Sequence, residues 1–218
     1  MTELPSPAGS TAAFAIQINL LGQVVGQVFD ANFNAQAALW SHGTLTLLPG
    51  IAGGNNSFPV GINIRGEIVG YSDDAANVPN TVVWRQGALT VLINNAVPAA
   101  INDEGQIVGR AGSPGTPFLW QNGATIQLPP IPGMSATGTA SGINDRGQIV
   151  GSSSNVAALW QNGTAIDLNS QIATTDPLQP YVRLQAGMHI NNLGQIVASG
   201  TDSRSPAIGR SYLLTPVN

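Results

Sequence analysis

The stretch GINDRGQIVG, residues 142–151, occurs in five versions along the chain and decides its fold. The other four versions are IQINLLGQVVG from Ile16, VGINIRGEIVG from Val60, AAINDEGQIVG from Ala99 and MHINNLGQIVA from Met188. The shared pattern is Ile-Asn-x-x-Gly-Gln-Ile-Val-Gly. Self-similarity at a period of this length indicates a repeat architecture.

A second motif follows each of the first four copies. It reads AALWSHGTLTLL from Ala37, VVWRQGALTVL from Val82, FLWQNGATIQL from Phe118 and AALWQNGTAIDL from Ala157. The repeat asparagines, Asn19, Asn63, Asn102, Asn144 and Asn191, are 44, 39, 42 and 47 residues apart. Two hairpins fit into one such unit, and four strands per unit are typical of a propeller blade.

Both motifs contain hairpin turns. Asn followed three residues later by Gly predicts a type I turn whose last residue has a positive φ. Asn122-Gly123 and Asn162-Gly163 predict two-residue type I′ turns. No segment has a helical period. We therefore predict an all-β fold, a single five-bladed β-propeller over residues 1–218 with four-stranded antiparallel blades.

The two ends of the chain look like parts of one blade. Leu4-Pro5 aligns with Leu128-Pro129, so residues 2–4 are predicted to form a fourth strand, while Leu214 near the C-terminus occupies the Trp position of a third strand. We expect the N-terminal strand to complete the last blade and to close the ring.

Composition excludes several classes of function. The 218 residues carry a net charge of −4, no lysine and no cysteine, and only 8% of them are charged. Nucleic-acid binding needs clustered basic residues, and seven scattered arginines do not supply them. No apolar run is long enough to span a membrane. The first residues, MTELPSPAGST, lack the regions of a signal peptide, so either one was removed or the protein is not secreted by that route. We expect a monomer without a cofactor.

The units GINxxGQIVGxS and A-[FA]-LWxxG resemble the HAF repeat, a bacterial repeat usually found in predicted extracellular proteins. The resemblance covers nearly the whole chain. It implies a propeller and an extracellular or periplasmic location, with a cytoplasmic one still open. It implies no substrate, because the family has no agreed activity.

The repeated polar and aromatic residues are interpreted as structural. Trp40, Trp84, Trp120 and Trp160 share one repeat position beside apolar residues, so packing between units is favoured over a role as sugar-stacking platforms. The repeat asparagines are explained by turn chemistry.

Catalytic groups are sparse. The predicted inner strands, around residues 13–18, 58–62, 97–101, 139–143 and 186–190, contain no Asp or Glu, which argues against a glycosidase with paired carboxylates. With two distant histidines and no cysteine, no transition-metal site is expected. His189 interrupts a series of mostly small residues and is the best catalytic candidate, although a buried, hydrogen-bonded histidine is the favoured interpretation.

The connections opposite the repeat turns vary in length, and variable connections on a rigid frame often carry function. Aromatic and charged residues on these connections, together with two polar inner-strand residues, make up the candidate ligand-binding set: Gln17, His189, Tyr181, Arg183, Tyr71, Asp74, Phe29 and Arg110. The favoured hypothesis is a binding module for a small molecule or glycan at this face and the pore mouth. An isomerase- or cyclase-like enzyme, or a structural surface protein, remains the alternative.

Overall fold

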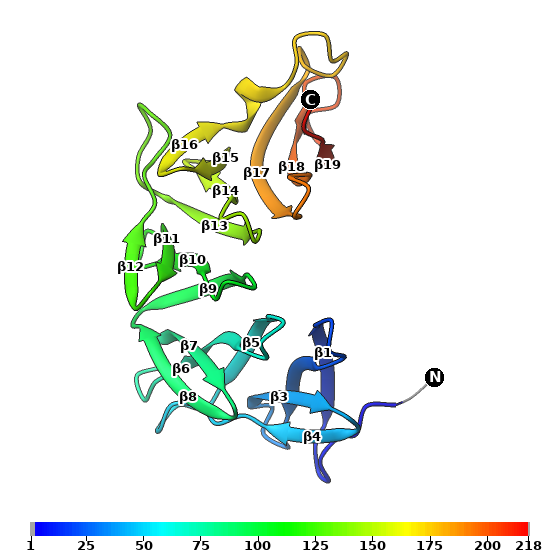
Figure 1. Cartoon of the computed structure of the whole chain (residues 1–218), viewed down its shortest axis with the longest axis vertical. Coiled ribbons are helices and arrows are strands. Elements are labelled where there is room, and N and C mark those ends of the chain that lie inside the picture. Colours follow the sequence, from blue (N-terminus) through cyan, green and yellow to red (C-terminus); the bar gives the residue numbers. More distant parts are fainter. Residues whose placement is uncertain (1–2, 218) are drawn as a thin grey trace. The chain divides into compact units, whose positions relative to one another are not determined.

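The computed structural model describes residues 3–217, which form five antiparallel sheets (Figure 1). Each sheet is a meander in which consecutive strands pair. The first holds β1 (Ala12–Ile18), β2 (Val24–Phe29), β3 (Ala35–Ser41) and β4 (Thr44–Leu47), and the second holds β5 (Ser57–Ile62), β6 (Ile68–Asp73), β7 (Pro79–Arg85) and β8 (Ala88–Ile93). The third holds β9 (Ala96–Ile101), β10 (Ile107–Ala111), β11 (Thr116–Gln121) and β12 (Ala124–Gln127).

The fourth sheet holds β13 (Gly138–Ile143), β14 (Ile149–Ser153), β15 (Val156–Gln161) and β16 (Thr164–Asp167), and the fifth holds β17 (Val182–Ile190), β18 (Ile196–Asp202) and β19 (Gly209–Leu214). One short 3-10 helix, Leu168–Gln171, follows β16 and is capped by the Asp167 side chain, which accepts a hydrogen bond from the Asn169 backbone. The expectation of strands and turns alone missed this helix because one helical turn leaves no periodic pattern.

The chain divides into two compact units, residues 1–107 and 108–218. The first unit contains the first two sheets and β9, and the second contains β11 to β19. The predicted inner strands match β1, β5, β9, β13 and β17 in position. The all-β prediction is therefore confirmed, with five sheets of three or four strands.

The predicted turns form as the sequence indicates. Asn122 and Gly123 have φ values of 52° and 80°, as a type I′ turn requires. All five repeat glycines, Gly22, Gly66, Gly105, Gly147 and Gly194, have a positive φ. Leu214 pairs with Ile196 as Trp160 pairs with Ile149, so Leu214 does take the Trp position of the fifth sheet.

Within each unit, adjacent sheets pack through an apolar interface. In the first unit Trp84 is fully buried in a cluster that joins Val25, Ala37 and Leu48 of the first sheet to the second sheet. In the second unit Val150 and Ala157 pack with Leu184 and other residues of the fifth sheet. The structural interpretation of the tryptophans is confirmed for the buried Trp40, Trp84 and Trp160, while Trp120 is partly exposed.

The tryptophan indoles tie consecutive repeats together by hydrogen bonds. Trp84 Nε1 donates to the Pro49 carbonyl oxygen at 2.8 Å, and Trp160 Nε1 donates to that of Pro129 at 2.7 Å. Each acceptor follows the outer strand of the preceding sheet. Trp40 Nε1 donates in the same way to Pro5 at 2.7 Å, so the N-terminal segment occupies the equivalent position beside the first sheet.

The predicted N-terminal strand over residues 2–4 is not observed. Thr2 lies outside the described residues, and Glu3 and Leu4 are in no strand. The fifth sheet has three strands, with β19 at its edge. A strand requires a ladder of backbone hydrogen bonds to a neighbouring strand, and none of the described strands pairs in this way with residues 3–5.

Candidate functional site

The two ends of each sheet differ in chemistry. At one end, here called the Asn-turn end, lie the repeat Asn-x-x-Gly turns and the tight x-Gly turns. At the other, the variable end, lie the connections between the second and third strands and between one sheet and the next. The β4–β5 connection spans residues 48–56, whereas only Asn94 and Asn95 connect β8 to β9.

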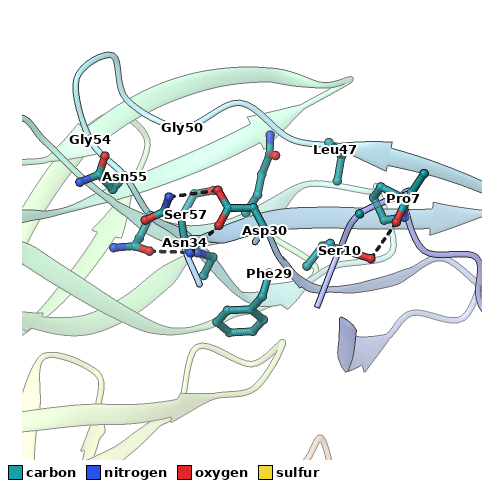
Figure 2. Close-up of a pocket in the computed structure, with 16 residues that line it drawn as sticks. Pro7, Ser10, Phe29, Asp30, Asn34, Leu47, Gly50, Gly54, Asn55 and Ser57 are labelled. Carbon is teal, nitrogen blue, oxygen red and sulfur yellow. Dashed lines mark hydrogen bonds between the residues drawn. The ribbon is translucent and has the colours of Figure 1, made fainter. Parts of the chain in front are cut away.

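A pocket of about 430 Å³ lies at the variable end of the first unit (Figure 2). It is lined by residues 7–10 of the N-terminal segment, residues 28–30 and 34–36 around the β2–β3 turn, and residues 54–57 before β5, with Leu47 and Gly50. The pocket depends on the long β4–β5 connection. The two-residue β8–β9 connection could not form an equivalent wall in the same unit.

Polar side chains in the pocket are positioned by hydrogen bonds. Asp30 Oδ1 accepts from the backbone nitrogens of Asn32 and Asn34, and Asp30 Oδ2 accepts from Asn34 Nδ2 at 3.0 Å. Asn56 Oδ1 accepts from the backbone nitrogen of Ala35. Figure 2 shows the Asp30 carboxylate beside Asn34, with Ser57 nearby. These bonds fix the β2–β3 turn against the β4–β5 connection.

Asp30 is ionised at neutral pH. The backbone N–H of Asn34 and then its side-chain amide lower the pKa of this exposed carboxyl below the ordinary value of 3.8. Asn56 Nδ2 donates to Asp73 Oδ2 at 3.2 Å, which places a second carboxylate behind the pocket wall.

Asp74, a predicted ligand residue, has a structural role in its turn. It lies 11 residues after Asn63, as Asp30 lies 11 after Asn19 and Asp202 lies 11 after Asn191. Its Oδ1 accepts from the backbone nitrogens of Ala76 and Val78, the same pattern as at Asp30. Asp74 does not line the pocket.

The predicted aromatic residues Phe29 and Tyr71 each pack against a phenylalanine. The Phe29 and Phe14 rings lie edge to face with centroids 5.9 Å apart, and Tyr71 stacks on Phe58 at 4.9 Å. Phe29 lines the pocket, but Figure 2 shows its ring directed away from Asp30 and Ser57. Tyr71 does not line the pocket.

In the second unit, Tyr181 belongs to an ion-pair cluster. The Arg204 guanidinium lies 4.5 Å from the Tyr181 ring centroid and bonds Asp202, with Nη2 to Oδ2 at 2.6 Å. Hydrogen bonds from the Arg204 side chain lower the pKa of Asp202 to about 2. Arg183 is exposed on β17, and Arg110 on β10 is exposed with its side chain beside Gly115.

Gln17 and His189 lie at the Asn-turn ends of β1 and β17, two residues before the repeat asparagines. Gln17 Oε1 accepts from the backbone nitrogen of Ile62 at 3.1 Å, which ties β1 to β5. His189 is exposed, contrary to the favoured interpretation of a buried histidine, and its Cα packs against Gly142. Eight residues at about 3.3 Å each separate His189 from Tyr181 by roughly 26 Å along the strand. Within the second unit, His189 and Tyr181 therefore lie at opposite ends of the fifth sheet.

Sequence reasoning missed the amides of the pocket: Gln36, Asn34, Asn55 and Asn56. Asn34 and Gln36 lie in the segment FDANFNAQ, residues 29–36, of which the predicted ligand-binding set contained only Phe29. Asn55-Asn56 precede the inner strand β5 as Asn94-Asn95 precede β9, so the pair itself recurs. Only the first pair ends a long connection between sheets, and the length of that connection was the usable signal.

Within residues 3–217 no group of three or more His, Cys, Asp or Glu side chains could hold a metal ion. In the same residues no helix has the length and apolar character needed to cross a membrane.

Comparisons with known proteins identify no family. No family model matches the chain, and no curated protein matches it. The resemblance to the HAF repeat therefore remains a resemblance.

Among solved structures, a gluconolactonase from Xanthomonas campestris is 10% identical with a TM-score of 0.48, covering 94% of this chain and 87% of its own. The β-propeller domain of the Trilobed protease from Pyrococcus furiosus is 8% identical with a TM-score of 0.43 over 95% and 82%. The SapL1 lectin, solved with alpha methyl fucoside, is 9% identical with a TM-score of 0.43 over 93% and 79%. Unrelated functions share such folds, so these likenesses assign no function to this chain.

Proposed function

We propose that this chain is a binding module for a small polar molecule or glycan, and that the ligand enters the pocket at the variable end of the first unit. The observation that carries the proposal is the pocket itself, whose walls include polar side chains held in place by hydrogen bonds to the backbone. Concave sites with a few fixed polar groups are typical of small-molecule binding.

Binding is favoured over catalysis because the pocket contains one ionisable side chain. Among the residues that line it, Asp30 alone titrates. Its lowered pKa leaves it without a proton to donate at neutral pH. General acid–base chemistry requires a proton donor and an acceptor on opposite sides of a substrate, so an isomerase or cyclase in this pocket would need a second group from elsewhere.

The proposal can be tested by ligand-observed NMR with a library of monosaccharides and small polar metabolites. Asn55 lines the pocket, is exposed, and makes no side-chain hydrogen bond within residues 3–217. Asn55→Ala should therefore weaken binding of any hit without lowering stability. Asn94→Ala, an exposed asparagine of the β8–β9 turn outside the pocket, is the matched control.

Gln17 and His189 define the competing location at the pore mouth. If Gln17→Ala and His189→Ala abolish binding of the same hit while Asn55→Ala does not, the site lies at the Asn-turn end and the pocket proposal is wrong. Binding abolished by Asn55→Ala alone supports the pocket.

We also propose that the five sheets are the blades of a closed propeller. Two repeat comparisons support closure. Val197 is 42% exposed, whereas its repeat equivalents Val25, Val69, Val108 and Val150 are fully buried. Ala15 is exposed, whereas its equivalent Gly187 is buried against Val150. A contact between Ala15 and Val197 would bury both residues in the manner of Gly187 and Val150.

The absence of cysteine makes closure directly testable. The double variant Ala15→Cys/Val197→Cys should form an intramolecular disulfide on mild oxidation, seen as faster migration in a non-reducing gel. Each single variant is the control. Free thiols in the double variant after oxidation would contradict closure, and disulfide-linked dimers would indicate an exchange between two copies.

A further inference from the structure

Apart from Asn55, each amide side chain of the pocket directs a donor to a protein acceptor. Three side-chain donors are directed to protein acceptors: Asn34 Nδ2 to Asp30, Gln36 Nε2 to the Leu48 carbonyl oxygen at 3.2 Å, and Ser10 Oγ to the Pro7 carbonyl oxygen at 2.8 Å. Because each acceptor is a carbonyl or carboxylate oxygen, the orientation of the two amides is fixed.

The same amides leave their carbonyl oxygens unused. Asn34 Oδ1 and Gln36 Oε1 accept no hydrogen bond within residues 3–217. Asp30 Oδ2 accepts a single hydrogen bond, from Asn34, and retains further lone pairs. A ligand rich in donors would satisfy these oxygens, and a ligand rich in acceptors would not.

The charge distribution of the first unit points in the same direction. Asp30, Asp73 and Asp74 lie at its variable end. Its two arginines, Arg65 and Arg85, both pair with Glu67 at the Asn-turn end. Within residues 3–107 no Arg, Lys or His lies at the variable end. There is no lysine, both arginines pair with Glu67, and the one histidine, His42, is in the β3–β4 turn. Within the first unit the pocket is therefore in a negative potential that no cation at the same end offsets.

We propose that the pocket binds an organic ammonium group carried on a small hydroxylated molecule, with the ammonium held by Asp30 Oδ2 and by the carbonyl oxygens of Asn34 and Gln36. The ammonium supplies three donors and a positive charge. This inference rests on the proposed function and narrows its ligand to cationic molecules. Carboxylated or phosphorylated ligands are disfavoured by both the charge and the acceptor surface.

Three probes of one ring size separate the possibilities: glucosamine in a buffer acidic enough to keep its amine protonated, glucose, and glucuronate. Isothermal titration calorimetry should give glucosamine a dissociation constant at least about tenfold lower than that of glucose, and no measurable binding of glucuronate. Raising the salt concentration should weaken glucosamine binding alone.

Asp30→Asn retains an oxygen for the turn hydrogen bonds and removes the charge. It should reduce glucosamine affinity to that of glucose while leaving the melting temperature nearly unchanged. Asp176→Asn, which also caps a turn through the Leu178 backbone but lies outside the pocket, is the control.

Two results would overturn the inference. Equal or tighter binding of glucose or glucuronate, still sensitive to Asn55→Ala, would contradict the ammonium assignment and leave the binding pocket in place. If none of the three probes, nor any member of the wider library, responds to Asn55→Ala, the proposed function fails as well.

Discussion

Replacement of Trp84 by alanine should be among the most destabilising single substitutions in the first unit. The side chain is 0% exposed and packs with Val25, Ala37 and Leu48 of the neighbouring sheet. Truncating a buried aromatic residue costs about 3–5 kcal/mol through lost apolar contact and the remaining cavity. Loss of the hydrogen bond to Pro49 adds about 0.5–1.5 kcal/mol. We expect a decrease of about 4–6 kcal/mol in the free energy of unfolding.

Trp84→Phe separates the two contributions, because it retains most of the ring and removes the donor. Its expected cost is about 1–3 kcal/mol, mostly from the Pro49 oxygen left without its partner. Urea unfolding followed by far-UV circular dichroism gives both values without relying on tryptophan fluorescence. Trp120→Ala, at a partly exposed equivalent position, should cost less than Trp84→Ala. A cost below about 1 kcal/mol for Trp84→Ala would refute the assignment of this residue to the interface between sheets.

Three further predictions concern local interactions. Burial alone would raise the pKa of Glu67, but hydrogen bonds from Arg85, Asn63 and Arg65 outweigh it and lower the pKa from 4.5 to about 2. Because the folded value is the lower one, this stabilisation is present above pH 4.5 and is lost as the pH falls toward 2, so Glu67→Gln should flatten the stability profile in that window; an unchanged acid-unfolding curve would contradict it. Gly151→Ala places a Cβ 2.0 Å from the Thr139 carbonyl oxygen and should cost about 2–3 kcal/mol or more, whereas Gly209→Ala meets nothing within 4 Å; equal melting temperatures would contradict the close approach. Asn63→Ala removes four hydrogen bonds of a buried side chain and should cost about 2–4 kcal/mol in urea unfolding, more than Asn191→Ala at the exposed fifth copy; the reverse order would argue against the tie from Asn63 to Asn102.

The repeat allowed the sheets to be predicted from the sequence, but it did not determine whether an N-terminal strand forms. Turn residues such as Asn122-Gly123 specify their φ angles locally, so four inner strands could be located within one residue, while β17 begins four residues earlier than predicted. A strand over residues 2–4 depends instead on a partner far away in the chain. The alignment of Leu4-Pro5 with Leu128-Pro129 still reflects a structural equivalence, because Pro5 and Pro129 accept equivalent hydrogen bonds from Trp40 and Trp160.

The candidate site was less predictable because residue type alone does not separate turn chemistry from ligand chemistry. Asp74 stood out as a carboxylate on a variable connection, yet Asp30 and Asp202 recur at the same repeat position, and all three accept a hydrogen bond from the backbone nitrogen two residues later. Asn55-Asn56 recur as well, as Asn94-Asn95 before β9, yet only the first pair lines the pocket. Recurrence in the sequence therefore does not separate the two roles; the long β4–β5 connection, which only the first pair ends, builds the pocket wall. His189 departs from the mostly small residues at its repeat position, and the variants at Asn55, Asn94 and His189 together decide between the two ends of the sheets.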